Sequence, residues 1–165
     1  MRKSVPTIPY RRKRELKTNY RKRVGLLKSG SNRLVIRKSN KYITIQVVSY
    51  KAEGDVVVKS CSSQQLAALG WKFSAKNIPA AYLTGLLIAK NMSSEKDKVC
   101  IADFGLQVPL KGDNKLYAAL KGVIDGGLSV KAGEGIFPSE DKLLGKNKSE
   151  DMQKAITDVK TKLLG

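Results

Sequence analysis

Arginine is confined to the first part of this chain. All eight arginines lie between Arg2 and Arg37, and the first forty-one residues also contain seven lysines and a single acid, Glu15. This segment carries +14 of the formal +18, whereas everything after Lys41 carries only +4. A stretch with one dominant charge sign and few apolar side chains cannot supply a packed core. The sequence therefore predicts a basic arm followed by a body of ordinary composition.

The length of 165 residues suits one domain with extensions. We expect a basic arm over residues 1–30, a globular core over residues 31–130 and a C-terminal extension over residues 131–165. No apolar window is long enough to span a bilayer, and prolines interrupt any signal-peptide core near the N-terminus. A cytoplasmic protein without a membrane segment is the expectation.

Three runs rich in β-branched residues predict consecutive strands. They are Arg33–Lys38, Tyr42–Tyr50 and Asp55–Ser60. Apolar and polar side chains alternate between residues 42 and 47, which is typical of an antiparallel sheet that is covered on one face. Turn-forming residues at 39–41 and 52–54 separate the runs, so the three strands should form a meander.

Capping residues and helical spacing predict the remaining elements. We expect a helix from Ser62 to Gly70, a helix over Pro79–Lys90, a strand over Val99–Phe104, a helix over Lys115–Ile124 capped by Asp113, and a tail helix capped by Ser149. The small residues Ala80, Ala81, Gly85 and Ala89 should let the second helix pack closely on the sheet. The tail helix is amphipathic and is expected to dock on a neighbour. The predicted fold class is α/β with a mixed sheet, and the elements follow one another along the chain in the order βββαβα.

The sequence lacks the residues and motifs that several enzyme classes need. Histidine is absent, which excludes Ser-His, Cys-His and histidine-based metal sites. Cys61 and Cys100 have no Cys-x-x-Cys spacing and are expected to be buried thiols. The tripeptide at residues 103–105 matches the magnesium-binding Asp-Phe-Gly of protein kinases, but the other kinase motifs are missing, so the match is taken as coincidence.

A metal-dependent nuclease is the enzyme alternative, because ribonuclease H-like folds begin with a similar meander and hold two metals with clustered carboxylates. The carboxylates to consider are Asp55, Asp103, Asp113 and Asp125. The first strand contains no acid, Asp113 suits a helix cap and Asp55 suits a turn. We therefore predict a protein that is not an enzyme and has no metal or other cofactor.

The arm should bind a polyanion, because neutralising phosphates releases their condensed counterions. Tyr10, Leu16 and Tyr20 are too sparse to insert into a membrane, and the two tyrosines could stack on bases. Nucleic acid is thus favoured over a membrane surface. A protein that condenses RNA or DNA without structural preference remains open as an alternative.

The residues resemble a known family along nearly the whole chain. The matching segments are Arg11–Glu15, Lys17–Arg23, Arg33–Lys41, Gly70–Lys72, Asn77–Gly85, Pro109–Gly112, Tyr117–Gly122 and Phe137–Asp141. They are similar to the archaeal and eukaryotic branch of the ribosomal protein L-eighteen family, and the length favours an archaeal form. The resemblance implies a ribonuclease H-like scaffold in the large ribosomal subunit that binds 5S rRNA and helps to attach it to 23S rRNA in the central protuberance, beside other ribosomal proteins. It implies no small-molecule substrate.

The same resemblance suggests which side chains contact RNA. They are Arg11, Arg12, Lys13, Arg14, Tyr20, Arg21, Lys22, Arg23, Arg33, Arg37, Lys38, Ser39 and Asn40. Ser39 and Asn40 are equally well explained as turn residues. Trp71 is expected to pack in the core or an interface more readily than on a base. The segment Lys17–Arg23 has helix-compatible spacing and is expected to be disordered or frayed in the free protein and to fold on RNA.

Overall fold

The computed structural model describes residues 7–92, 99–108, 114–133, 135–146 and 149–164. Its elements, in chain order, are α1 (Arg11–Arg14), α2 (Tyr20–Lys28), β1 (Asn32–Lys38), β2 (Ile43–Lys51), β3 (Gly54–Ser62), the 3-10 helix η1 (Ser63–Leu69), α3 (Ile78–Asn91), β4 (Cys100–Asp103), α4 (Lys115–Asp125), α5 (Glu140–Leu143) and α6 (Glu150–Leu164). The predicted α/β class is confirmed. Within these residues no helix is long and apolar enough to cross a membrane.

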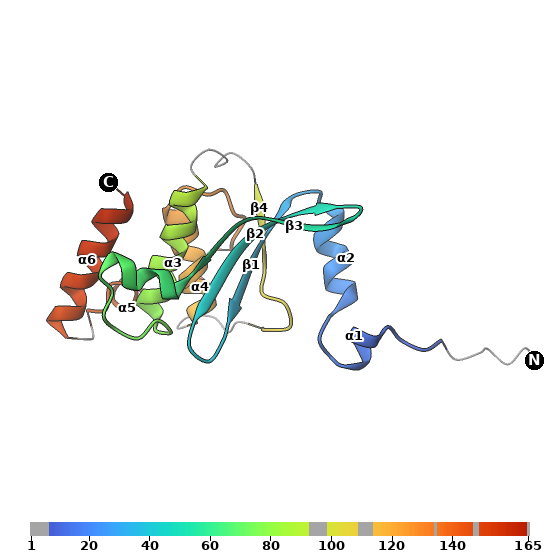
Figure 1. Cartoon of the computed structure of the whole chain (residues 1–165), viewed down its shortest axis with the longest axis horizontal. Coiled ribbons are helices and arrows are strands. Elements are labelled where there is room, and N and C mark those ends of the chain that lie inside the picture. The colour runs from blue at the N-terminus through green and yellow to red at the C-terminus, as the bar shows by residue number, and fades with distance from the viewer. Residues whose placement is uncertain (1–6, 93–98, 109–113, 134, 147–148, 165) are drawn as a thin grey trace, which may run out of the picture.

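The strands form one mixed sheet with the order β3-β2-β1-β4 (Figure 1). The meander of β1, β2 and β3 is antiparallel, and β4 pairs with β1 in parallel. Ile43, Ile45 and Val47 are fully buried while the residues between them are only partly covered, so the predicted alternation along β2 is confirmed. The register between β2 and β3 shifts between Val47 and Val48, where a bulge interrupts the ladder.

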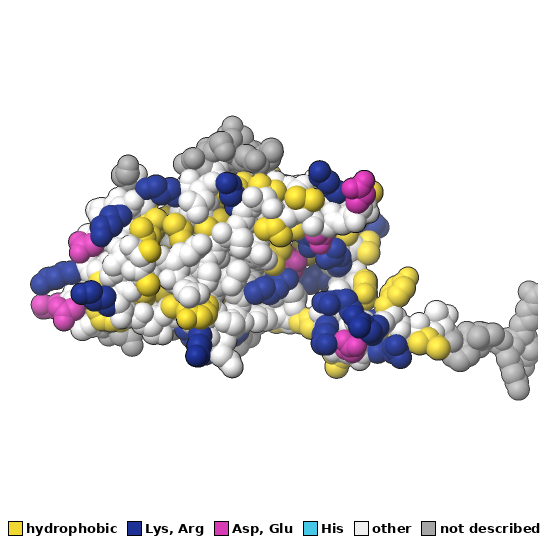
Figure 2. All heavy atoms as spheres, in the orientation of Figure 1, with side chains coloured by type: hydrophobic (Ala, Val, Ile, Leu, Met, Phe, Trp, Pro, Cys, Tyr) yellow, Lys and Arg dark blue, Asp and Glu magenta, His cyan; other side chains and the backbone are white. Residues whose placement is uncertain are grey.

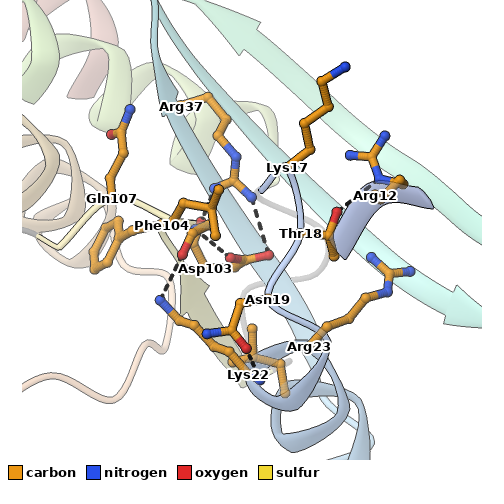
Figure 3. Close-up of a pocket in the computed structure, with 13 residues that line it drawn as sticks. Arg12, Lys17, Thr18, Asn19, Lys22, Arg23, Arg37, Asp103, Phe104 and Gln107 are labelled. Carbon is orange, nitrogen blue, oxygen red and sulfur yellow. Dashed lines mark hydrogen bonds and ion pairs between the residues drawn. The ribbon is translucent and has the colours of Figure 1, made fainter. Parts of the chain in front are cut away.

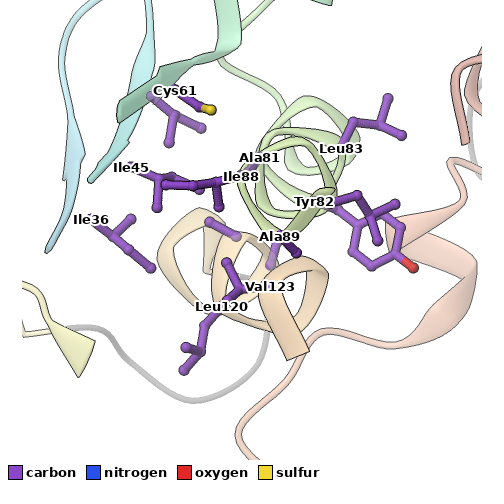
Figure 4. Packing of buried hydrophobic residues seen from close by; sticks show 14 of the residues in the cluster. Ile36, Ile45, Cys61, Ala81, Tyr82, Leu83, Ile88, Ala89, Leu120 and Val123 are labelled. Carbon is purple, nitrogen blue, oxygen red and sulfur yellow. The ribbon is translucent and has the colours of Figure 1, made fainter. Parts of the chain in front are cut away.

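The helices α3 and α4 cover one face of the sheet, and α6 lies on the far side of α3 (Figure 1). Ile36 and Ile45 of the sheet point toward Ile88 of α3 and Leu120 of α4 in the core (Figure 4). Cys61 lies in the same core, as expected for a buried thiol. The order of layers is therefore sheet, paired helices and tail helix, and the opposite face of the sheet is left for the arm.

Local capping signals are realised with two differences from expectation. Ser62 and Gln65 form the predicted capping box and Gly70 ends the element with φ 99°, but the turn they enclose is a 3-10 helix. The Asn77 side chain accepts the hydrogen bond that starts α3. The cap of α4 is Asn114, whose side chain accepts from the backbone N–H of Leu116. Asp113, the cap that the sequence suggested, lies outside the described residues.

The helix α3 packs on the sheet as expected, but its small residue Gly85 faces another helix. Gly85 faces α4, and a Cβ there would meet the backbone of Ala119 and Val123. Gly122 of α4 faces back, and its Cβ would meet the carbonyl of Tyr82. The two glycines therefore let the backbones of α3 and α4 touch.

The apolar face of the tail helix is buried within this chain. Ile156, Val159 and Leu163 of α6 belong to the main core, packed against α3 and η1. Lys162 Nζ donates to the carbonyl of Leu69 at 3.1 Å, which ties the same helix to the end of η1. The apolar face of α6 is therefore covered within the chain, and the docking of this helix on a neighbouring molecule stays a prediction.

Candidate nucleic-acid interface

The basic arm runs along the edge of the body and reaches beyond it at one end (Figure 1). Lysine and arginine side chains gather on it and form the densest basic surface on the visible face of the molecule (Figure 2). Neither α1 nor α2 contains a buried residue. Polar contacts fix α2 to the body: Lys22 Nζ donates to the carbonyl of Gly105 at 3.0 Å, and Arg23 Nη2 donates to Asp55 Oδ2 at 2.7 Å.

A cavity of about 360 Å³ opens where the arm meets the segment after β4 (Figure 3). We call it the arm cavity. Its cationic lining comes from both sides, with Arg12, Lys17, Lys22 and Arg23 from the arm and Arg37 from β1. The remaining lining includes one acid, Asp103. A concave surface with this excess of guanidinium and ammonium groups attracts phosphate oxygens.

An alternating chain of charges runs beneath the arm cavity. Asp55 Oδ2 lies 2.7 Å from both Arg23 Nη2 and Arg33 Nη2. Arg33 Nη1 lies 3.6 Å from Asp103 Oδ2, and Arg37 Nη2 lies 3.4 Å from the same oxygen. The network thus joins α2, β3, β1 and β4 and leaves one guanidinium charge in excess over its carboxylates. Since unpaired charges are costly to bury, this pairing allows Arg33 to be only 3% exposed.

The Asp55 carboxylate is stabilised in its charged form. Burial acts to raise its pKa, but hydrogen bonds and charge from Arg23 and Arg33 outweigh this, and the pKa of Asp55 is lowered from 3.8. The carboxylate is therefore ionised near neutral pH. It remains paired with both arginines under those conditions.

Arg37 is held by its surroundings while part of it stays open. Its Nη1 donates to the carbonyls of Ile36 and Asp103, and its guanidinium lies directly over Gly105, which has φ +63°. Asp103 Oδ1 in turn accepts from the backbone N–H of Gly105 at 2.7 Å. The Arg37 side chain is still 42% exposed, so it can present a pre-oriented positive charge to the arm cavity.

The predicted RNA-contacting residues lie in three different settings. Arg11, Arg12, Lys13 and Arg14 are exposed on α1, and Tyr20, Arg21, Lys22 and Arg23 lie on α2. Arg33 is buried in the charge network, which leaves it a structural part of the sheet in this conformation. Lys38, Ser39 and Asn40 do not reach the arm cavity and line a separate one.

The turn interpretation of Ser39 is supported by its contacts. Its hydroxyl accepts from the backbone N–H of Tyr42 and donates to the carbonyl of the same residue, both at 3.0 Å. The backbone N–H of Ser39 also donates to that carbonyl. The hydroxyl is thus already used to close the hairpin between β1 and β2.

The aromatic residues divide as their sequence context suggests. Tyr10 and Tyr20 are paired with ring centroids 5.2 Å apart, and Tyr10 is 73% exposed. Trp71 is buried, donates to the carbonyl of Ser74 and meets the ring of Phe73 edge-on. The expectation that Trp71 packs in the core is confirmed, and Tyr10 of the arm presents an exposed aromatic face.

Sequence reasoning missed several residues of the arm cavity. Lys17, Thr18 and Asn19 line it but were not among the predicted contacts, although they lie inside the basic arm. Gln107 also lines it, from the segment that follows β4. Position in the arm could have indicated the first three, whereas nothing in the local sequence marks Gln107.

The carboxylates considered for a metal site have other partners. Asp55 and Asp103 pair with arginines, and Asp125 pairs with Lys121 at 2.7 Å and accepts from the Tyr82 hydroxyl at 3.0 Å. Across the described ranges, no group of three or more His, Cys, Asp or Glu residues is placed to hold a metal ion. Asp55 also lies in β3 and not in a turn, which corrects the sequence interpretation.

Comparison with known proteins points in one direction. Residues 7–99 match the family described as ribosomal large subunit proteins 60S L5 and 50S L18. The chain is 44% identical over 140 residues to the large ribosomal subunit protein uL18 of Korarchaeum cryptofilum, covering 85% of this chain and 71% of the relative. It is 42% identical to the uL18 proteins of Methanococcus maripaludis, over 88% of this chain and 77% of the relative, and of Methanobrevibacter smithii, over 85% and 72%.

Proposed function

This chain belongs to the family of ribosomal large subunit proteins 60S L5 and 50S L18, and we propose that it is a structural constituent of the large ribosomal subunit that binds 5S rRNA. It is not an enzyme, in keeping with that family. Its proposed place is the central protuberance, where it would help to attach 5S rRNA to 23S rRNA beside neighbouring ribosomal proteins. Its compartment would then be that of the cytoplasmic ribosome.

The observation that carries this proposal is the basic arm cavity. Double-helical RNA has a deep, narrow major groove that hides base edges, so proteins contact its phosphates, its 2′-hydroxyls and its unstacked loop bases. The arm cavity offers several cations on a concave surface, and the exposed Tyr10 of the arm can stack on an unpaired base. This combination suits a folded RNA with both helices and loops.

We propose that the RNA contacts are made by the exposed and half-buried members of the predicted set. These are Arg11, Arg12, Lys13, Arg14, Tyr20, Arg21, Lys22, Arg23, Arg37, Lys38 and Asn40, with Ser39 acting through its turn. We assign Arg33 to the scaffold because both of its contacting nitrogens face carboxylates. The proposed layout keeps an arm over residues 1–30, a core over 31–130 and an extension over 131–165.

We also propose that the core is a ribonuclease H-like scaffold used for RNA binding. Support comes from the antiparallel meander and the parallel β4 beside β1, with helices on one face. The carboxylates that a nuclease would use for metals are occupied by arginines at two positions. A scaffold of this kind would keep the shape of a nuclease without its chemistry.

The first test is the binding of full-length protein to 5S rRNA and to an unrelated RNA of equal length, across a series of salt concentrations. Replacing Arg12, Lys17 and Lys22, three cations that line the arm cavity, by glutamine should weaken 5S binding on the order of a hundredfold. It should also reduce the slope of log K against log salt by up to about 1 for each lost phosphate contact.

A matched control removes the same charge elsewhere. Lys51, Lys59 and Lys131 are exposed and lie outside the arm cavity, so glutamine at all three should change 5S affinity far less. Equal affinity of the wild-type protein for both RNAs would contradict the 5S assignment and favour a nonspecific polyanion binder. Equal losses in both triple variants would show that total charge, and not the arm, determines binding.

A further inference from the structure

A second basic cavity lies at the turn between β1 and β2. It has a volume of about 420 Å³ and is lined by Lys38, Ser39, Asn40, Lys76, Asn114 and Lys115. We call it the lysine cavity. It shares no lining residue with the arm cavity. Its lysines come from three separate parts of the chain: the end of β1, the segment before α3 and the first turn of α4.

Among the described residues the three lysines have no anionic partner. Within the described part of the chain, Lys38, Lys76 and Lys115 form no ion pair, and the described lining of the cavity contains no carboxylate. Lys76 and Lys115 are also half-buried, which limits their contact with water. Burial lowers the pKa of Lys115, and the nearby charges of Lys76 and Lys38 lower it further. The fold therefore holds like charges together with nothing in the described chain to neutralise them.

Two helices reinforce the positive potential. Lys115 is the first residue of α4, and Lys76 precedes Asn77, the cap of α3. The N-terminal ends of both helices carry partial positive charge. Such an arrangement of ammonium groups and amide dipoles favours an oxyanion that bridges the lysines.

The lysine cavity and the arm cavity lie on opposite faces of the sheet. Successive side chains along a strand point to opposite faces. On β1, Arg37 points to the face that carries the arm, while Ile36 points into the core beneath α3 and α4. Lys38, two residues after Ile36, follows it onto the helix-covered face and lines the lysine cavity together with Lys115. One strand thus supplies a cation to each cavity.

We propose that the lysine cavity is a second RNA site, which binds backbone phosphates independently of the arm. This inference rests on the proposed function, because it assumes that the physiological polyanion is ribosomal RNA. Backbone phosphate fits the described lining, which offers ammonium donors and amide groups but no aromatic ring for base stacking. The protein would then hold RNA on both faces of its sheet.

The test replaces Lys76 and Lys115 by glutamine and measures 5S rRNA binding across a salt series. If 5S rRNA reaches the cavity, the salt slope should fall by about 1 for each lysine, with affinity reduced on the order of tenfold. The matched control is the Lys51→Gln, Lys59→Gln double variant, whose lysines are exposed and outside both cavities. Thermal unfolding of both variants verifies that they are folded at the temperature of the assay.

Lysine acetylation read by mass spectrometry identifies the source of the phosphates. Protection of Lys76 and Lys115 by 5S rRNA alone assigns the bound phosphates to that RNA. Protection only in the assembled large subunit, lost after ribonuclease digestion, assigns them to another ribosomal RNA. The proposal is overturned if both lysines react equally in all states, or if protection survives ribonuclease. If wild-type protein shows no 5S preference, the proposed function fails instead, so the two failures are distinguishable.

Discussion

Two glycines determine how closely the central helices α3 and α4 approach each other. Gly85 on α3 and Gly122 on α4 face each other's helix, and a Cβ at either position would run into backbone atoms. Backbone atoms cannot rotate away as a flexible side chain can, so the helices would have to separate. Because α3 and α4 together cover the sheet, that separation would loosen the whole core.

Gly122→Ala should therefore destabilise the protein. The new methyl group would clash with the carbonyl oxygen of Tyr82, and overpacking of this kind costs about 1–3 kcal/mol in the free energy of unfolding. Urea denaturation followed by circular dichroism measures the change. Gly25→Ala is the control, since Gly25 lies in α2 with open space around its Cβ position, and alanine there should be neutral or stabilising by up to about 1 kcal/mol. Equal losses at both glycines would contradict this account.

The glycines also show what a sequence can and cannot predict at this scale. The sequence indicated that Gly85 marks a close approach, because a glycine inside a helix usually has a packing reason. It could not indicate the partner, since periodicity defines a face of a helix but not the element opposite that face. Arg33 illustrates the same limit, because its burial depends on carboxylates of β3 and β4 that are distant in sequence.

At the scale of elements, α2 depends on an ion pair and a hydrogen bond for its position. It buries no residue of its own, and its described ties to the body are Arg23 to Asp55 and Lys22 to Gly105. Isolated helices of this length are marginal in water. The attachment through Asp55 is therefore a main reason for α2 to stay on the sheet in the absence of RNA.

Asp55→Asn should loosen α2 and remove a pH dependence. The pKa of Asp55 is lowered by folding, so its stabilisation is present above the unfolded value near 3.8 and is lost as pH falls through the lower, folded value. Near neutral pH the free energy of unfolding of the variant should be about 1–3 kcal/mol lower than that of wild type. The backbone amides of Tyr20–Lys28 should also exchange faster with deuterium. The difference from wild type should shrink as pH falls from 3.8 through the lower, folded pKa of Asp55.

The matched control for Asp55 is Glu53→Gln. Glu53 is exposed in the turn before β3 and forms no ion pair in the described part of the chain. Its replacement removes the same charge and should leave exchange in α2 unchanged. A similar gain in exchange in both variants would mean that overall charge, and not the contact with Arg23, holds the helix.

Elements with a strong local signal were predictable from the sequence. The alternation along β2, the capping box at Ser62 and the cap at Asn77 are contained in a few adjacent residues, and each is present in the structure. The short α5 was not predicted, because four residues carry too little periodicity to recognise. Local chemistry therefore defines where elements begin, and tertiary packing decides what they touch.

For the whole molecule, the segregation of arginine in the sequence becomes a segregation in space. The arm with its arginines lies at one end and α6 lies at the other, with the sheet and paired helices between them (Figure 1). The sequence predicted the arm as a basic surface. It could not predict the lysine cavity, because Lys76 and Lys115 are isolated lysines that only the fold brings beside Lys38.

The tail helix tests whether the C-terminal extension is part of this single structure. Ile156 of α6 is 1% exposed and belongs to the same core cluster as the strands. Ile156→Ala should lower the free energy of unfolding by about 2–5 kcal/mol, because it leaves a cavity against α3. Thermal unfolding should still show one transition, at a lower temperature, since the core is shared.

Leu164 supplies the comparison on the same helix. It is 56% exposed, so Leu164→Ala should change stability by less than about 0.5 kcal/mol. If the extension instead unfolded independently of the core, Ile156→Ala would melt α6 in a separate transition at lower temperature and leave the main transition in place. A single shifted transition would mean that α6 is part of the same cooperative core as the strands and the paired helices.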